Sequence, residues 1–156
     1  MPRFRSAGIV IKGGKILLMH RIKNGREYYV FPGGGVEPDE TNEQAAIREV
    51  FEETSIKVEI KKLLYHNVYD DDTEQFFYLC KYLSGEPKLG NSNEAETMKN
   101  DPGNIYDPCW YELKLLFQLL LYPLEVRDLL LQDVPSNFTN ATREAKIKVS
   151  EIRHTL

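Results

Sequence analysis

A proline and glycine break followed at once by a helix signal constrains the fold of this 156-residue chain more than any other feature. Pro32 and the three glycines at 33–35 end a short strand pattern at residues 28–31, because proline cannot donate to a strand ladder and glycine weakens a strand. Residues 41–44 then form a capping-box pattern, which predicts a helix over residues 42–54. The chain must therefore pass from strand to helix through a tight glycine loop.

Aliphatic and aromatic runs on both sides of that helix predict two antiparallel hairpins. The first turns at Gly13 and Gly14, a pair that supplies the positive φ angles of a tight turn. The second turns at the acidic residues 70–72, whose spacing lacks the glycine of a calcium-binding loop. The expected strands are residues 6–11, 15–20, 28–31, 56–69, 75–83 and 106–113. With a long polar loop at residues 89–104 and a second helix at residues 124–131, this order predicts an α/β fold.

Composition favours a soluble single domain and excludes several classes of partner. A hydrophobic fraction of 42% over 156 residues is enough to build one core. The net charge of −4 gives no extended positive surface for long nucleic acid. No apolar run is long enough to span a membrane, and Cys80 and Cys109 have no metal-binding or disulfide spacing. We therefore expect a cytoplasmic protein with one domain over residues 1–134 and a polar tail over residues 135–156.

The helix over residues 42–54 concentrates acidic side chains. Glu49, Glu52 and Glu53 are expected on one outer face, because successive helical residues turn by about 100°. The stripe expected to face the core is Ile47, Val50, Phe51 and Thr54. Like charges at this spacing repel by roughly 0.2–0.5 kcal/mol per pair, so the face needs solvent or a cation. Carboxylates suit a hard cation such as Mg²⁺ or Mn²⁺, although such a string taken alone is also common on plain solvated surfaces.

The glycine loop and the acidic helix stand together at one particular set of spacings. Residues 34–56 read GGVEPDETNEQAAIREVFEETSI. This pattern resembles the signature of the Nudix hydrolase superfamily, which includes MutT-like proteins, with Ser55 where the family has glycine. That glycine would follow the helix end in a left-handed conformation, where a side chain costs about 1 kcal/mol. The resemblance implies an α/β/α sandwich around a mixed central β-sheet.

The resemblance also implies a role for each charged position of the signature. Glu52 and Glu53 would be the principal metal ligands, with Glu49 either a further ligand or the base that activates water. Arg48 would orient the catalytic carboxylates, among them Glu52, although an ordinary helix-surface ion pair is also consistent with its position. Glu40 would support the site or the bound substrate. Together these residues would form a metal-dependent hydrolase of phosphoanhydride bonds, with Mg²⁺ or Mn²⁺ as the cofactor.

Residues outside the helix complete the expected site. Gly33 and Gly34 let the backbone approach a metal or a substrate phosphate closely, and the resemblance favours a metal-binding carbonyl at Gly33. The family often adds one acid from a later loop, for which Glu94 and Glu96 are nearly equal candidates, and Glu94 is the one chosen. Arg21, at the end of the second strand, could bind a substrate phosphate through two donors or simply face solvent.

The substrate is the least constrained part of the interpretation. The signature leaves the nucleoside and the leaving group to other loops. Markers of the family's NADH-cleaving, ADP-ribose-cleaving and diadenosine-polyphosphate-cleaving groups are absent, so a nucleoside triphosphate, including oxidised forms, or a nucleotide sugar stays open. Aromatic side chains that could stack on a base are Tyr65, Tyr69, Phe77, Tyr78 and Trp110. The rivals are a catalytically silent nucleotide-binding or regulatory module and an isomerase acting on a diphosphate, and a homodimer stays open.

Overall fold

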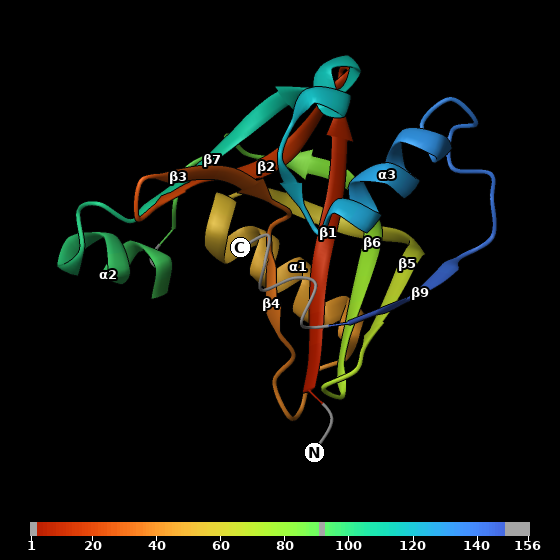
Figure 1. The fold of residues 1–156 in the computed structure, drawn as a ribbon, viewed down its shortest axis with the longest axis horizontal. Helices are drawn as coiled ribbons and strands as arrows, with labels where there is room; N and C mark the ends of the chain where they lie inside the picture. The colour runs from red at the N-terminus through yellow and green to blue at the C-terminus, as the bar shows by residue number, and fades with distance from the viewer. Residues whose placement is uncertain (1–2, 91–92, 149–156) are drawn as a thin grey trace.

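The computed structural model describes residues 3–90 and 93–148, and Figure 1 shows a sheet layered between helices. The strands are β1 (Arg3–Lys12), β2 (Lys15–Lys23), β3 (Arg26–Val30), β4 (Gly33–Gly35), β5 (Lys57–Tyr69), β6 (Thr73–Ser84), β7 (Ile105–Glu112), β8 (Leu121–Tyr122) and β9 (Arg143–Ile147). The helices are α1 (Asn42–Thr54), α2 (Asn93–Asn100), the 3₁₀ helix η1 (Leu113–Gln118) and α3 (Leu124–Asp133). No helix in the described part of the chain is long and apolar enough to cross a membrane.

The sheet is mixed, and β1 lies at its centre. The hydrogen-bonded order is β8-β3-β2-β1-β6-β5-β9, with β4 also paired to β1 and β7 to β2. β1 runs antiparallel to β2 and parallel to β6, whereas β5 and β6 form an antiparallel hairpin. Gly13 and Gly14 turn between β1 and β2 at φ angles of 56° and 75°, which confirms the predicted tight hairpin. β1 therefore connects the two hairpins and also carries the glycine strand β4.

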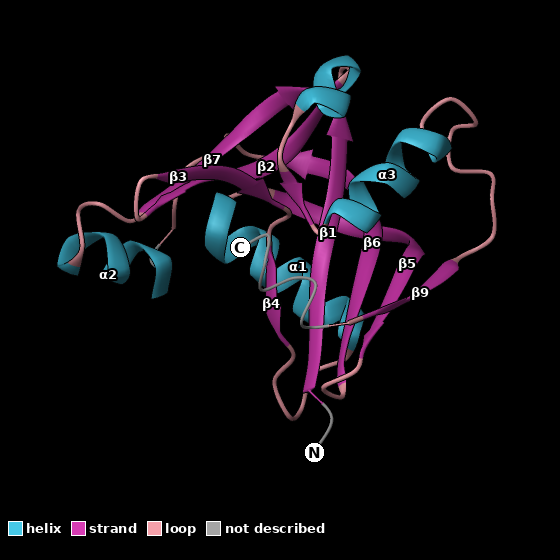
Figure 2. Cartoon of the chain, in the orientation of Figure 1, coloured by secondary structure: helices cyan, strands magenta, loops and turns pink. Residues whose placement is uncertain are grey.

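Helices cover both faces of the sheet, as Figure 2 shows, and each face has its own apolar cluster. α1 packs Val50 into the cluster on one face. On the other face, η1 and α3 place Leu116 and Leu130 in a cluster that includes Phe77 of β6. This layering confirms the expected α/β/α sandwich with a mixed sheet.

The segment expected as a long loop contains a helix. α2 lies at the edge of the molecule and contacts β7 (Figure 1). Its apolar residues are few, so no apolar stripe marks it in the sequence. Glu94 and Glu96 in its first turn nevertheless favour a helix, because they lie near the positive end of the helix dipole. The expectation of a loop over residues 89–104 is wrong for this stretch.

Part of the expected polar tail belongs to the sheet. β9 runs parallel to β5, and its side chains alternate between half-buried and exposed before ending on a buried residue. This alternation is typical of a strand with one face toward solvent. Buried Asp133 of α3 holds the segment through contacts with Arg143 and Asn140. Residues 143–147 therefore form a strand where the sequence predicted a tail, and residues 149–156 lie outside the described chain.

α1 presents different faces to the core and to solvent than the sequence predicts. Phe51, expected in the buried stripe, is 46% exposed, although its neighbours Val50 and Thr54 are fully buried. Glu53, expected on the outer face, is only 5% exposed. The reason is β4, which packs beside α1 and brings the backbone of Gly33 within hydrogen-bonding distance of Glu53. A helical wheel contains no information about this neighbouring strand.

Candidate active site

Side chains fix both ends of α1, which sets the direction of its acidic face. Thr41 Oγ1 accepts from the Gln44 backbone N–H at 3.1 Å, and the Gln44 side chain accepts from the Thr41 N–H at 2.8 Å, so the predicted capping box is confirmed. Ser55 follows the helix at a φ of 64°, and its Oγ donates to the Lys88 carbonyl at 2.7 Å. The serine that replaces the expected glycine therefore keeps the left-handed turn and adds a hydrogen bond.

The first two glycines of β4 leave no room for side chains. A Cβ at Gly33 would lie 2.5 Å from a backbone oxygen of β1, and one at Gly34 would lie 2.6 Å from the carboxyl carbon of Glu49. At Gly35 a Cβ would meet nothing within 4 Å. The Gly33 N–H donates to Glu53 Oε2 at 3.2 Å. These glycines therefore bring the backbone of β4 directly against the carboxylates of α1.

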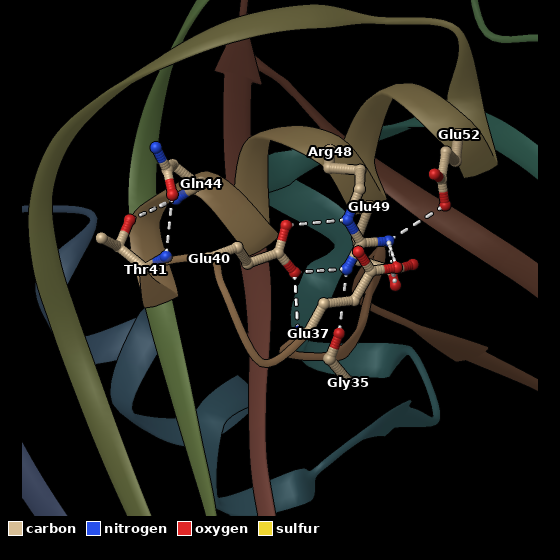
Figure 3. A network of polar contacts seen from close by, with 8 residues as sticks. All are labelled: Gly35, Glu37, Glu40, Thr41, Gln44, Arg48, Glu49 and Glu52. Atoms are coloured by element: carbon tan, nitrogen blue, oxygen red, sulfur yellow. Dashed lines mark hydrogen bonds and ion pairs between the residues drawn. The ribbon is translucent and has the colours of Figure 1, made fainter.

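Arg48 is the centre of the polar network in Figure 3. Its guanidinium donates to the two oxygens of Glu40 at 2.6 and 3.0 Å, to Glu49 at 2.9 Å and to Glu52 at 3.1 Å. It also donates to the Gly35 carbonyl at 3.0 Å. The hydrogen bond from Arg48 lowers the pKa of Glu40, and the bond to Glu40 raises the pKa of Arg48. One side chain thus fixes three carboxylates and the backbone of β4 in a single arrangement.

The carboxyl groups of Glu53 and Glu49 are shielded from water and lie close to other acidic side chains. Burial, followed by the charges of Glu94 and Glu49, raises the pKa of Glu53 to about 9. Burial also raises the pKa of Glu49, while the hydrogen bond from Arg48 opposes that rise. Both shifts arise because negative charge is gathered where water is scarce. A cation placed here would relieve the repulsion.

The donor set fits a hard divalent cation in its chemistry. The candidate donors are the Gly33 carbonyl and the carboxylates of Glu49, Glu52, Glu53 and Glu94. Oxygen ligands of this kind suit Mg²⁺ and Mn²⁺. Among the described residues, no three acidic, histidine or cysteine side chains are arranged around one ion position, and Arg48 explains this because it holds Glu49 and Glu52 toward itself. Buried Glu53 makes no ion pair within the described part of the chain, so it is the carboxylate that most needs a cation.

Two adjoining cavities open at this network. The first has a volume of about 520 Å³ and is called the aromatic cavity here. Its ring-bearing lining residues are Phe31, Tyr69, Phe77, Tyr106 and Tyr122. The second, of about 630 Å³, is called the acidic groove, and its lining includes Arg48 and the three glycines of β4. The carboxylates that line the acidic groove are Glu37, Glu49, Glu52, Glu94 and Glu96. The cavities meet at Arg5, Gly33 and Glu94, which line both.

Arg21 lines the aromatic cavity, but it is largely buried and two of its five N–H donors are engaged. It is 9% exposed, its Nε donates to the Ile105 carbonyl at 3.0 Å, and its Nη2 donates to Asn104. Its guanidinium carbon also lies 3.5 Å from the centre of the Tyr106 ring. Arg21 therefore holds the start of β7 against β2, and the Tyr106 ring lies against its guanidinium.

The other residues expected near the substrate divide between the cavity and the core. Tyr69 and Phe77 line the aromatic cavity. Tyr65 and Tyr78 are buried at 1% and 3% exposure, and Trp110 packs edge-on against another aromatic ring. The structure also separates the two candidate loop acids, because Glu94 lines both cavities whereas Glu96 lines only the acidic groove.

Several lining residues escaped the sequence interpretation. Those with polar or aromatic side chains far from the signature include Arg5, Tyr106, Tyr122 and Glu125. Each lies far along the chain from the helix signature, on a different strand or at the start of α3. Strand alternation could have assigned the side chains of Arg5, Tyr106 and Tyr122 to one face of their own strands. It could not have shown which strands meet, so no local signal identifies this group.

Comparison with known proteins identifies the family. Residues 2–129 match the model of the NUDIX domain, so the chain belongs to the Nudix family. It is similar to a MutT-like protein from Streptomyces ambofaciens, with 37% identity over 93 residues that span 57% of this chain and 58% of that protein. It is also similar to an ADP-ribose pyrophosphatase from Methanocaldococcus jannaschii, with 36% identity over 117 residues that span 68% of each chain.

A solved structure supports the same fold. A NUDIX hydrolase from Nitrosomonas europaea superposes with a TM-score of 0.72 at 20% identity, over 94% of this chain and 79% of that chain. At this identity the likeness concerns the fold alone. The matched region spans less than two thirds of the length of the Streptomyces protein.

Proposed function

We propose that this protein is a metal-dependent pyrophosphohydrolase that cleaves a phosphoanhydride bond in a nucleotide-like compound. One observation carries the proposal, namely that the acidic groove and the aromatic cavity meet at Arg5, Gly33 and Glu94. A small ligand with an apolar ring at one end and phosphates at the other would have complementary surroundings along its whole length. Membership of the Nudix family agrees with this chemistry.

The acidic groove, together with Glu53 in the adjoining wall of the aromatic cavity, provides the groups that the reaction needs. A bound Mg²⁺ or Mn²⁺ would supply charge neutralisation of the phosphates and activation of a water molecule. Glu52 and Glu53 are the principal residues to hold it, with Gly33 and Glu94 as further donors. Glu49 is either a further ligand or the group that takes the proton of the attacking water. Arg48 keeps Glu49 and Glu52 in place through bonds of 2.9 and 3.1 Å, which lowers the cost of ordering them during the reaction.

The aromatic cavity favours a nucleoside as the other half of the substrate. Its volume of about 520 Å³ is within the usual range for small-molecule sites. Tyr69, Tyr106 and Tyr122 contribute aromatic rings to the lining beside a base, and Glu125 adds a hydrogen-bond acceptor. We favour a nucleoside triphosphate, including oxidised forms, or a nucleotide sugar. The relative from Methanocaldococcus jannaschii is named as an ADP-ribose pyrophosphatase, so ADP-ribose should be tested alongside the nucleoside triphosphates.

A substrate panel tests the proposal. Release of phosphate, pyrophosphate and nucleoside monophosphate is measured for nucleoside triphosphates, oxidised guanine nucleotides and ADP-ribose with Mg²⁺, with Mn²⁺ and with a chelator. We expect turnover that requires the metal and that falls at least about 100-fold in Glu53→Gln. Glu59→Gln, an exposed carboxylate of β5 outside both cavities, is the matched control and should keep full activity.

The same panel distinguishes the rival readings. Metal-stimulated binding of a nucleotide without turnover would indicate the catalytically silent module. Turnover that is unchanged by the chelator and by Glu53→Gln would rule out the metal-dependent mechanism. Product analysis in ¹⁸O-labelled water then locates the phosphorus that is attacked.

A further inference from the structure

Three arginines line the two cavities, and they differ in what they already bind. Arg5 and Arg48 line the acidic groove, and Arg5 and Arg21 line the aromatic cavity. Arg48 is committed to carboxylates and to the backbone of β4. Arg21 is committed to the Ile105 carbonyl and to Asn104. Arg48 uses all five of its N–H donors in such bonds, whereas Arg21 is only 9% exposed and has the Tyr106 ring against its guanidinium.

Arg5 has no such commitment. Its side chain is exposed, and within residues 3–90 and 93–148 its guanidinium makes no hydrogen bond or ion pair. The other arginine on this strand, Arg3, differs, because it is bound to Asp71 at 2.9 Å and to Thr73 at 3.1 Å. Among the described residues, Arg5 is thus the arginine at the cavities whose five N–H donors are all available to a ligand.

Strand pairing on both sides fixes the backbone position of Arg5. Arg5 pairs with Gly35 of β4 on one side and with Gln75 of β6 on the other. Gly35 has no side chain to cover it, and Gln75 accepts a hydrogen bond from the Tyr69 hydroxyl at 3.2 Å. Both Gln75 and Tyr69 line the aromatic cavity. Arg5 therefore lies where the two cavities meet, between Gly35, which has no side chain, and the polar side chain of Gln75.

The geometry points to Arg5 as the residue that binds the substrate phosphate nearest the nucleoside. This inference rests on the proposed function, because it assumes that the nucleoside lies in the aromatic cavity and the phosphate chain continues into the acidic groove. At the junction a phosphate would approach the carboxylate of Glu94, whose negative charge opposes it. The planar guanidinium of Arg5 can donate two hydrogen bonds to phosphate oxygens and offset that repulsion.

Binding measured without catalysis tests this role. Calorimetry with ADP and with adenosine, in the presence of a chelator, separates recognition of the phosphates from recognition of the nucleoside. Arg5→Gln should weaken ADP binding by roughly 10-fold to 100-fold, which is the range for a hydrogen bond to a charged group. Adenosine binding should not change. Arg5→Lys should lose less than Arg5→Gln, because it keeps the charge but not the two-donor geometry.

Arg3→Gln is the matched control, since Arg3 lies on the same strand and lines neither cavity. It should leave the affinities for ADP and adenosine unchanged. Circular dichroism and melting temperature should show that Arg5→Gln folds normally, because the side chain is exposed and unpaired among the described residues. In steady-state kinetics, Arg5→Gln should raise KM more than it lowers kcat.

The outcomes separate this inference from the proposed function. Loss of ADP affinity with unchanged adenosine affinity supports the role of Arg5, even if no substrate is hydrolysed by the wild-type protein. Unchanged ADP affinity, or an equal loss for both ligands, overturns it even if the wild-type protein is an active hydrolase. Failure of the wild-type protein to bind either ligand also overturns it. Failure of the hydrolysis panel alone counts against the proposed function only.

Discussion

A methyl group on Gly34 would lie 2.6 Å from the carboxyl carbon of Glu49, so β4 and α1 meet at the acidic groove with no spare space. Gly34→Ala must therefore displace the Glu49 carboxylate or move β4. We expect the rate of hydrolysis to fall about 100-fold, because a shift of about 1 Å in a reacting group has an effect of that size. We also expect a lower melting temperature. Steady-state kinetics and thermal unfolding of the purified variant measure the two effects.

Gly35→Ala is the control for that substitution. Gly35 is the next residue of the same strand, and a Cβ there would meet nothing within 4 Å. Its free energy of unfolding should stay within about 0.5 kcal/mol of the wild-type value. An equal loss of stability and rate in the two alanine variants would show that β4 needs glycine for backbone freedom. It would contradict a specific effect of the close contact between Gly34 and Glu49.

The ion pair between Glu40 and Arg48 predicts a dependence of stability on pH. Arg48 lowers the pKa of Glu40 below its ordinary value of 4.5. A carboxylate of this kind stabilises the fold above its ordinary pKa, and the stabilisation is lost as the pH falls through the lowered value. Glu40→Gln should therefore lower the free energy of unfolding by about 1 kcal/mol at neutral pH. The difference should shrink as the pH falls below 4.5, as urea denaturation at neutral pH and at pH 3 would show.

A gap between Glu40→Gln and the wild-type protein that stays constant down to pH 3 would contradict an electrostatic origin. Glu59→Gln again serves as the comparison, because Glu59 is 57% exposed and only 3.8 Å from Lys81. Exposed pairs of this kind contribute between 0 and about 1 kcal/mol. This variant should show little effect at either pH.

Two features of Ser55 have opposite effects on the free energy of unfolding. Its φ of 64° strains a residue that has a side chain, while its Oγ gains a hydrogen bond of 2.7 Å to the Lys88 carbonyl. Ser55→Gly removes both, and each term is worth about 1 kcal/mol, so the free energy of unfolding should change little. Ser55→Ala keeps the strain and loses the bond, so it should destabilise the protein by about 1 kcal/mol. Chemical denaturation of the pair checks the ordering, and a more stable alanine variant would contradict it.

Local features of the sequence predicted local features of the structure. The capping box at Thr41 and Gln44, the left-handed residue after α1 and the glycine turn between β1 and β2 all depend on neighbours within a few positions. The identity of the helix signature also follows from spacing within 23 residues. These features could be read because the interacting residues are adjacent in the chain.

Features that depend on distant neighbours could not be predicted in the same way. Glu53 is buried because β4 packs beside α1, which a helical wheel does not include. Arg5 reaches the site because β1 lies between β4 and β6, and nothing in residues 1–12 indicates that position. α2 and β9 carry few apolar residues, so they are ordered by contacts that appear only in the folded chain.

Asp133 illustrates such contacts and leads to a final prediction. Its carboxylate, 4% exposed, accepts from the Tyr65 hydroxyl at 2.7 Å and from Asn140 Nδ2 at 2.7 Å, and it forms an ion pair with Arg143 at the start of β9. Asp133→Ala removes all three contacts and leaves the buried Tyr65 hydroxyl without its acceptor. The free energy of unfolding should fall by about 3 kcal/mol, in line with other buried ion pairs that lose one partner.

Asp128→Ala, in the same helix, is the matched comparison. Asp128 is 58% exposed and pairs with the adjacent Arg127 at 2.9 Å, so its loss should cost less than about 1 kcal/mol. Urea denaturation measures both variants. Because Asp133 joins α3, β5 and β9, Asp133→Ala should also make the peptide bonds of residues 143–147 more accessible to protease than they are in Asp128→Ala. Equal stability and equal cleavage of the two variants would mean that β9 is held by its pairing with β5 alone.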